Sequence, residues 1–265
     1  MNSLLADALS TLPTGARVLD CGGWLIPLDL ATHVADIMPY ETRRGRLSLG
    51  PLPEERFTKA TWLQCDFLQT AFRLPFPDGY FSFSTCSHTL EDLVDPFPLL
   101  IELQRVSRAG CLVTPSRLYE QTAGIRDRMT SRRGHPHHHW ILDTVEGKPQ
   151  FSHKGDSLRG SWWSTSVPLS LAEEIGRVSA QAIEWSFVWD GQFEWSTSRG
   201  SGAHAQAREF ARHVGATRAR LAKDGLRRQL RRLKYIRRVR NERLIASWWS
   251  DMVQLSEPYS RIPLK

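Results

Sequence analysis

The segment from Leu74 to Pro115 constrains the fold of this chain more than any other. It reads as a proline- and glycine-containing turn, a buried strand over Tyr80–Thr85, a helix opened by an aspartate-proline pair, and a second buried strand over Cys111–Thr114. Two strands joined by a helix in this order predict half of a doubly wound α/β sheet. Ligands of such sheets bind outside the carboxyl ends of the strands, so the segment also predicts a site near Ser87-His88.

Three predicted strands that precede this segment each end in an aspartate. A carboxylate at the end of the second strand can accept both hydroxyls of a ribose, and glycines after the first strand let a ligand approach the backbone closely. These features favour a nucleoside-like ligand, and ordinary solvated strand ends are the alternative. The predicted strands are Gly15–Gly23, Thr32–Asp36 and Ala60–Phe67, the acids are Asp20, Asp36 and Asp66, and the glycines are Gly22 and Gly23.

The whole chain predicts an α/β fold with a Rossmann-like, mostly parallel, seven-stranded sheet and helices on both faces. Only sixteen positions separate the first two aspartates, so we expect a truncated helix or an irregular loop there. We expect an insert over about 117–168 that contains a hairpin, and a late antiparallel pair over 182–189 and 192–196 that completes the sheet. The predicted division is a domain of residues 1–199 and a basic helical C-terminal extension of residues 200–265.

These patterns resemble the class I methyltransferases that use S-adenosylmethionine, in the branch called methyltransferase type 11. The resemblance is carried by GARVLDCGG at Gly15–Gly23 and by the LPFPDG turn, strand and helix that begin at Leu74. It covers about Gly15 to Pro115 and implies S-adenosyl-L-methionine as cofactor and methyl transfer to a small-molecule acceptor. Gly22-Gly23-Trp24 stands where the family usually has three spaced glycines.

The resemblance also implies roles for single residues around the cofactor. The glycines after the first strand would lie along the amino-acid part of the cofactor. Residues at the ends of the second and third strands would contact the ribose and the adenine, and the end of the fourth strand would lie near the methionine. The implied residues are Gly22 and Gly23 at the amino-acid part, Asp36 at the ribose, Ile37, Asp66 and Phe67 at the adenine, and Ser87 with His88 at the methionine end. Asp20 is a further expected cofactor-binding residue, and Trp24 with Pro27 would line or cap the pocket.

Four of the nine histidines lie within five positions, in the run Gly134–Trp140. Imidazole can take a proton near neutral pH, and an oxygen or nitrogen nucleophile that is methylated must lose one. Because the run follows the fifth strand, it could fold over the strand ends, so we expect the general base to be His88 or a histidine of this run. A transition-metal site and a polar surface loop are the alternatives, and the sequence assigns no metal ligand. The histidines of the run are His135, His137, His138 and His139.

The net charge of +7 is concentrated in Arg218–Arg243, which holds twelve Lys and Arg against two acids. Leu226, Leu230, Leu233 and Ile236 recur there near helical spacing, which predicts an amphipathic helix with a cationic face. Such a face is ordinarily solvated, and nucleic acid is the alternative partner because clustered Arg and Lys neutralise phosphates. The alternative functions are therefore an RNA methyltransferase that uses this helix and a cofactor-binding relative without catalysis.

An apolar content of 41% is enough for a sizeable core, and no stretch approaches the roughly 18 to 20 consecutive apolar residues of a membrane span. The N-terminal residues lack the pattern of a signal peptide. The four cysteines lie in or beside predicted strands, where small buried side chains in a reducing compartment are expected. We therefore expect a cytoplasmic protein, while the methyl acceptor and the oligomeric state stay open.

Overall fold

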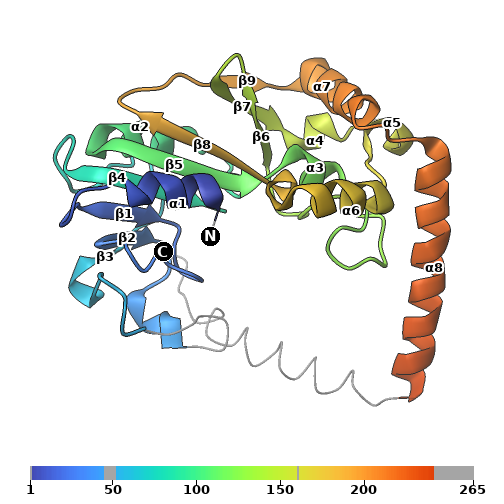
Figure 1. Cartoon of the computed structure of the whole chain (residues 1–265), viewed down its shortest axis with the longest axis horizontal. Coiled ribbons are helices and arrows are strands. Elements are labelled where there is room, and N and C mark those ends of the chain that lie inside the picture. Colours follow the sequence, from blue (N-terminus) through green and yellow to red (C-terminus); the bar gives the residue numbers. More distant parts are fainter. Residues whose placement is uncertain (1, 45–51, 160, 242–265) are drawn as a thin grey trace.

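The computed structural model describes residues 2–44, 52–159 and 161–241, and its main element is a six-stranded sheet (Figure 1). The strand order is β3-β2-β1-β4-β5-β8, and neighbouring strands are parallel except β8, which is antiparallel to β5. The predicted mostly parallel α/β sheet is therefore confirmed. The strands are β1 (Val18–Cys21), β2 (His33–Asp36), β3 (Trp62–Gln64), β4 (Phe81–Ser87), β5 (Ser107–Pro115) and β8 (Glu184–Asp190).

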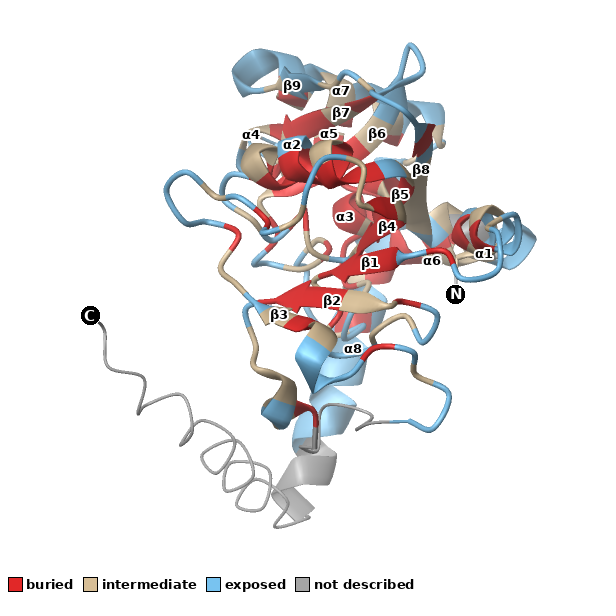
Figure 2. Cartoon of the chain, turned by 90° about the vertical axis from the view of Figure 1, so that its left-hand side faces the viewer, coloured by how far each residue is buried: buried red, intermediate tan, exposed pale blue. Residues whose placement is uncertain are grey.

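Helices cover both faces of this sheet, because alternate side chains of the strands point to opposite faces. On one face, α1 (Ser3–Ser10) packs Leu5 and Leu9 against β1, β4 and β5. On the other face lies α2 (Phe97–Val106), whose apolar residues form one stripe at a spacing of three and four. Figure 2 shows buried residues concentrated in the strands between these layers. The stripe on α2 consists of Leu99, Leu100, Leu103 and Val106, which are fully buried.

The junction between α2 and β5 differs from the prediction. The sequence predicts that Ala109-Gly110 ends the helix, but β5 follows α2 directly and contains this pair. A Cβ atom on Gly110 would lie 2.2 Å from the Trp189 ring and 2.3 Å from the carbonyl oxygen of Ser84. Close packing of β8 and β4 around the strand, and not a turn, therefore requires glycine here.

The prediction of a seventh strand in the main sheet is wrong. β8 confirms the first member of the predicted late pair, but the second, over 192–196, does not return to the sheet. Gly191 has a φ of +73° and turns the chain, and the Phe193 N–H then donates to Oε1 of Gln104 on α2 at 2.8 Å. The chain thereby leaves the sheet and joins a second, smaller one as β9 (Ser196–Ser198).

The predicted hairpin is present between β5 and β8 and belongs to this second sheet of three strands. Its strands pair in an antiparallel register, and β9 adds to one of them in parallel. Short helices surround it. This part of the chain contains α3 (Arg117–Gln121), β6 (Trp140–Val145), β7 (Lys148–His153), α4 (Lys154–Ser157), α5 (Trp162–Thr165) and α6 (Leu169–Val178). Short 3-10 helices are η1 (Tyr40–Arg44), η2 (Lys59–Thr61) and η3 (Ala180–Ile183).

The first C-terminal helix packs against the second sheet. This helix, α7 (Gly200–His213), buries Ala203, Ala207 and Ala211. Gln121 Nε2 donates to the carbonyl oxygen of Ala207 at 2.9 Å. The small alanine side chains allow the Gln121 side chain to reach the backbone of α7.

The last described helix, α8 (Arg218–Asn241), buries Leu221, Asp224 and Arg228 in its first half and then projects from the domain (Figure 1). Asp224 accepts the Ser170 N–H at 2.9 Å, and Arg228 is buried beside Trp162. The predicted basic run is helical as far as the described residues extend, and Arg243 with the rest of 242–265 lies outside them. Within the described residues, no helix combines the length and apolar character that a bilayer span requires.

Candidate active site

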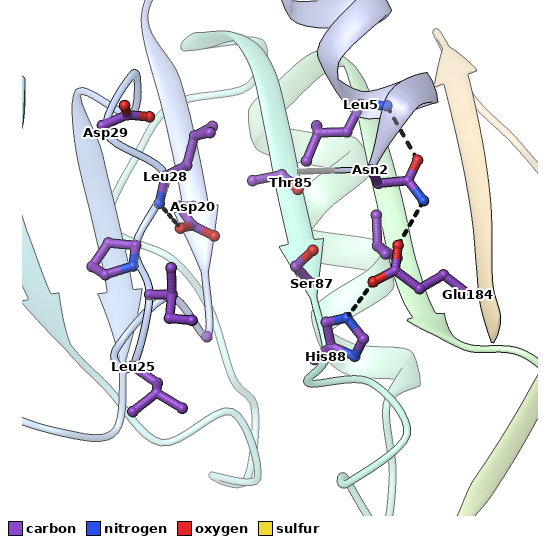
Figure 3. A pocket seen from close by; sticks show the side chains of 15 residues that line it. Asn2, Leu5, Asp20, Leu25, Leu28, Asp29, Thr85, Ser87, His88 and Glu184 are labelled. Carbon is purple, nitrogen blue, oxygen red and sulfur yellow. Dashed lines mark hydrogen bonds and ion pairs between the residues drawn. The ribbon is translucent and has the colours of Figure 1, made fainter. Parts of the chain in front are cut away.

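The carboxyl ends of β1 and β4 lie next to each other in the middle of the main sheet. The chain turns from β1 toward β2 and from β4 toward β5, in opposite directions, so this is the switch point at which open α/β sheets bind ligands. A cavity of about 590 Å³ opens there (Figure 3). It is lined by Asn2, Leu5, Asp20, Gly22, Gly23, Leu25, Ile26, Pro27, Leu28, Asp29, Thr85, Ser87, His88, Val113 and Glu184.

The polar groups of this cavity are predominantly acidic. Three carboxyl groups line it, those of Asp20, Asp29 and Glu184, together with the imidazole of His88. Its described lining contains no Lys or Arg, although the chain as a whole carries a net charge of +7. The electrostatic potential inside such a cavity favours a cationic ligand.

Asp20 is the buried carboxyl group of the cavity. Its side chain is 3% exposed, and Oδ2 accepts the Leu28 N–H at 2.8 Å. Burial raises the pKa of Asp20 to about 7, the Leu28 hydrogen bond lowers it by less, and the charge of Asp36 adds to the rise. Because a cation beside Asp20 would favour the ionised carboxylate, occupancy of the cavity by a cation and ionisation of Asp20 are linked.

The two glycines after β1 permit close contacts inside the protein. Gly22 has a φ of +80°, and a Cβ atom there would lie 1.8 Å from Oγ1 of Thr89. A Cβ atom on Gly23 would lie 2.3 Å from Oδ2 of Asp20. Both positions therefore require glycine for the loop after β1 to pack on the loop after β4 and over the buried carboxyl, and both expose backbone to the cavity.

His88 is held between two carboxyl groups at the end of β4. It has a φ of +53° and is half exposed. Its Nε2 lies 3.4 Å from Oε1 of Glu184, and its Nδ1 lies 3.6 Å from Oε1 of Glu91. Interaction with Glu91, and less strongly with Glu184, raises the pKa of His88 in spite of partial burial. The cavity thus contains an imidazole whose protonated form is stabilised.

The structure brings together about half of the residues that the sequence predicts for the cofactor. Asp20, Gly22, Gly23 and Ser87 line the cavity with His88. Figure 3 shows Asp20 on one side of it and Ser87 and His88 on the other. The remaining predicted residues lie outside its lining, namely Trp24, Asp36, Ile37, Asp66 and Phe67.

These remaining residues make contacts within the protein or face solvent. The carboxylate of Asp36 is buried and accepts the N–H groups of Trp24 at 3.0 Å and Met38 at 2.7 Å. Burial raises the pKa of Asp36, and the backbone hydrogen bonds lower it by less. Phe67 is buried in the core, while Ile37 is 57% exposed. Asp66 accepts the N–H of Leu68 at 2.9 Å.

Sequence reasoning missed the far wall of the cavity. Glu184 enters from β8, almost a hundred positions after His88, and Asn2 Nδ2 donates to its Oε2 at 3.0 Å. Asn2 also caps α1 through its Oδ1, which accepts the Leu4 N–H at 3.1 Å. A polar residue before a helix signals a cap, but no local pattern could reveal that this cap faces a strand from the other end of the domain.

Residues 21–114 match the model of a family described as a methyltransferase domain. In this part, about a third of its length, the chain carries a class I S-adenosylmethionine-dependent methyltransferase domain. The match includes Gly22, Gly23, Ser87 and His88 and begins one residue after Asp20. Glu184 and the histidine run lie outside the matched part of the methyltransferase domain.

Individual proteins are similar to parts of this chain. It is 30% identical over 115 residues to a demethylmenaquinone methyltransferase of Bacillus licheniformis. The aligned region covers 40% of this chain and 48% of the relative. The chain thus spans about half the length of that relative. Solved methyltransferase structures from Mesorhizobium loti and Aquifex aeolicus are each 16% identical. The first covers 79% of either chain with a TM-score of 0.33, and the second covers 42% of this chain and 64% of that one with a TM-score of 0.30.

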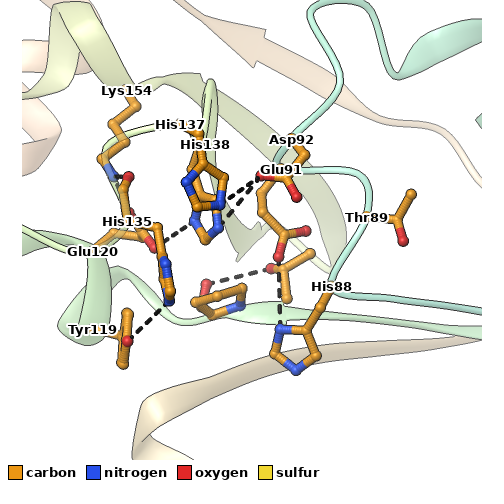
Figure 4. Close-up of polar contacts among 12 residues, drawn as sticks. His88, Thr89, Glu91, Asp92, Tyr119, Glu120, His135, His137, His138 and Lys154 are labelled. Atoms are coloured by element: carbon orange, nitrogen blue, oxygen red, sulfur yellow. Dashed lines mark hydrogen bonds and ion pairs between the residues drawn. The ribbon is translucent and has the colours of Figure 1, made fainter. Parts of the chain in front are cut away.

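The histidine run does not line the cavity of the methyltransferase domain. Three of its rings, those of His135, His137 and His138, cluster between the loop after β4 and the second sheet (Figure 4). His139 is tied in by its backbone, because its N–H donates to the Glu91 carbonyl at 2.6 Å. Burial is the main cause that lowers the pKa of His135 to about 4. The run therefore packs on the loop that carries His88 without entering the cavity.

Proposed function

We propose that this chain catalyses methyl transfer from S-adenosylmethionine to a small-molecule acceptor, at the cavity between the ends of β1 and β4. The observation that carries the proposal is the charge of that cavity. It has three carboxyl groups and one imidazole and no Lys or Arg in its described lining. S-adenosylmethionine, when bound, would supply a methyl group on a sulfonium cation, and its amino-acid part adds an ammonium group.

The donor set fits the amino-acid half of this cofactor. Asp20 is a buried carboxyl whose pKa is raised to about 7, so an ammonium or sulfonium charge nearby would offset its burial. Gly22 and Gly23 expose backbone in the same cavity, and Ser87 adds a hydroxyl. We propose that these four residues hold the amino-acid end.

For the nucleoside half of the cofactor, we propose the predicted residues that lie outside the cavity lining. Each carboxylate oxygen of Asp36 accepts one backbone N–H, and a carboxylate has roughly four acceptor positions, so it retains capacity for ribose hydroxyls. We keep Asp36 as the proposed ribose ligand and Asp66 as the proposed adenine ligand. Ile37 and Phe67 are the proposed apolar neighbours of the adenine, and Trp24 is proposed to line or cap the pocket.

His88 is the general base that the geometry supports best. With its Nδ1–H directed to the buried Glu91, Nε2 on the side of the cavity keeps the lone pair that takes the proton from the acceptor. The imidazolium that results is stabilised by the carboxyl groups of Glu184 and Glu91. His135, His137, His138 and His139 stay as predicted alternatives, but they lie outside the cavity lining.

Calorimetry with S-adenosylmethionine and S-adenosylhomocysteine tests the proposal. We expect one site per chain for either ligand, with weaker binding of both by Gly22→Val, whose side chain would overlap Thr89 and distort the loop after β1. Gly147→Ala, in the turn between β6 and β7, serves as the control, because Gly147, with a φ of +76°, shares the positive φ of Gly22 but a Cβ atom there meets nothing within 4 Å. Absence of heat with both ligands from the folded wild-type chain would refute the enzyme and favour a structural relative that has lost catalysis.

An RNA acceptor is a second candidate, because α8 projects and the side chains of Arg227, Arg231 and Arg232 on it are exposed. RNA binding that falls steeply with salt, and that is lost in a variant with Arg227, Arg231 and Arg232 changed to alanine, would support it. Arg228 should be left in place, since it is buried against Trp162. If the triple variant still binds RNA, α8 has no role in RNA binding. The proposed division into residues 1–199 and a basic extension of 200–265 places this helix outside the catalytic part.

A further inference from the structure

We propose that His135, His137, His138 and Asp92 form a site for one divalent transition-metal ion, for which zinc is the best fit. The proposal is independent of methyl transfer, because it rests on a cluster outside the cavity. One ligand atom from each of the three histidines lies within 4.8 Å of the others. The three ring centroids are 4.6 to 5.2 Å apart.

Asp92 supplies the fourth ligand. Its Oδ1 lies 3.5 Å from Nε2 of His137 and 3.5 Å from Nε2 of His138. These separations are longer than a good hydrogen bond. They are close to the roughly 3.3 Å between two ligand atoms on one tetrahedral zinc ion, given zinc–ligand bonds of about 2.0 to 2.1 Å. The distance from the Asp92 carboxylate oxygen to each of the two imidazole nitrogens is thus close to the one that a shared zinc ion would give.

His135 has a ring nitrogen to spare. Its Nε2 lies 3.1 Å from the hydroxyl of Tyr119, on which the ring stacks at 5.5 Å between centroids. The other nitrogen, Nδ1, is buried and has no hydrogen-bond partner among the described residues. Since a buried polar atom without a partner costs free energy, a metal bond to Nδ1 would remove this penalty.

Glu120 and Lys154, which lie next to the cluster, orient the proposed ligands through hydrogen bonds. Oε1 of the buried Glu120 lies 2.8 Å from Nδ1 of His138, so Nε2 is left to face the ion. Metal-binding histidines are oriented in this way by a carboxylate on the other ring nitrogen. Lys154 pairs with the other oxygen of Glu120 and with the carbonyl of His135 (Figure 4). Its positive charge is therefore neutralised by Glu120 and is not left facing the ion.

The site would join two segments far apart in sequence. Asp92 belongs to the loop after β4, and the histidines belong to the insert before β6. The neighbouring Glu91 carbonyl already accepts the N–H groups of His139 and Trp140. Four protein ligands complete a tetrahedral site, which is typical of a structural metal. We infer that the ion clamps the insert onto the loop that runs back to His88.

Zinc and cobalt titrations of the full chain, prepared without a polyhistidine tag and stripped of metal, test the site. We expect one zinc ion per chain by elemental analysis and by calorimetry. Cobalt should give the visible spectrum of a tetrahedral nitrogen and oxygen site. A sulfur-to-cobalt band in the near ultraviolet would instead place the ion on cysteines and overturn the assignment.

Two variants with exposed side chains keep the test separate from folding. His137→Ala and Asp92→Asn should weaken zinc binding by at least the roughly 10- to 100-fold that loss of a supporting partner causes. His213→Ala, an exposed histidine on α7, is the matched control and should bind zinc as the wild type does. Circular dichroism checks that all variants are folded. Stoichiometry below one in the wild type, or equal affinity in His137→Ala and His213→Ala, would overturn the proposal.

Discussion

The two halves of the main sheet are built differently, and the difference locates the cavity. Between β4 and β5 the chain forms α2, whose apolar stripe is fully buried on the sheet. Between β1 and β2 it forms an irregular loop instead of a helix. That loop exposes Leu25 and Ile26 and lines the cavity above Asp20. The regular half therefore stabilises the fold, whereas the half without a helix leaves room for a ligand.

The regular half is also tied together by polar contacts. Arg105 of α2 donates to the carbonyl oxygens of Leu74 at 2.9 Å and Phe76 at 2.8 Å, and it pairs with Glu102 and Asp78. The turn before β4 is thereby fixed to the helix. The loop after β1 is held differently, by buried carboxylates that accept its backbone N–H groups, Asp20 from Leu28 at 2.8 Å and Asp36 from Trp24 at 3.0 Å.

The largest expected effect separates the two halves by stability. Leu103→Ala removes a fully buried side chain of α2 and should cost about 2–5 kcal/mol of unfolding free energy. Ile26→Ala in the loop after β1, where the side chain is 71% exposed, should change it by less than about 0.5 kcal/mol. Urea unfolding followed by circular dichroism measures both. Similar losses in the two variants would contradict the contrast between the halves.

The next effect concerns Asp20, because burial of its ionised carboxylate lowers the free energy of unfolding. A carboxyl whose pKa rises from 3.8 in the unfolded chain to about 7 in the fold loses stability as pH rises through this range. The full shift corresponds to about 4 kcal/mol well above pH 7. Asp20→Asn should therefore raise the melting temperature at pH 8 by several degrees and have little effect at pH 4.

A matched acid sharpens this result. Asp29 also lines the cavity but is exposed, so Asp29→Asn should leave the melting temperature at pH 8 nearly unchanged. A higher melting temperature of Asp20→Asn would show that Asp20 lowers the stability of the fold, as expected of a residue that serves a binding site. A destabilised Asp20→Asn at pH 8 would show that the carboxylate is needed for the fold itself.

The sequence predicted the regular half well because its signals are local. The apolar periodicity of α2 and the buried runs of β4 and β5 depend on neighbouring residues, and only the boundary at Gly110 was wrong. Gly110 is fixed by the Trp189 ring, which comes from a strand eighty positions later. The missing seventh strand has a similar cause, because the Phe193 N–H donates to the side chain of Gln104 on α2 and not to a neighbouring strand.

The candidate site could be predicted only where it follows a strand directly. Asp20, Gly22, Gly23, Ser87 and His88 stand at strand ends and line the cavity. Glu184 was missed because its approach to His88 depends on the antiparallel register of β8 with β5. That register is a property of the assembled sheet and leaves no pattern near either residue.

The smallest expected effect concerns Glu184, on the β8 side of the cavity. Because Glu184 contributes less than Glu91 to raising the pKa of His88, Glu184→Gln should lower that pKa slightly, back toward its usual 6.5. A titration of the His88 ring protons by NMR measures it, with Glu194→Gln, on an exposed residue away from the cavity, as the control. A pKa of His88 that does not move in Glu184→Gln would remove Glu184 from the site.

The affinity for S-adenosylmethionine as a function of pH tests the central claim, that a buried carboxyl beside the loop after β1 receives a cationic cofactor. Calorimetry from pH 5.5 to 8.5 should show affinity that rises by up to about ten-fold per pH unit below pH 7 and levels above it, as Asp20 ionises. Asp20→Asn should bind more weakly above pH 7 and with no such rise. A wild-type affinity that is independent of pH, or that Asp20→Asn reproduces, would contradict the account.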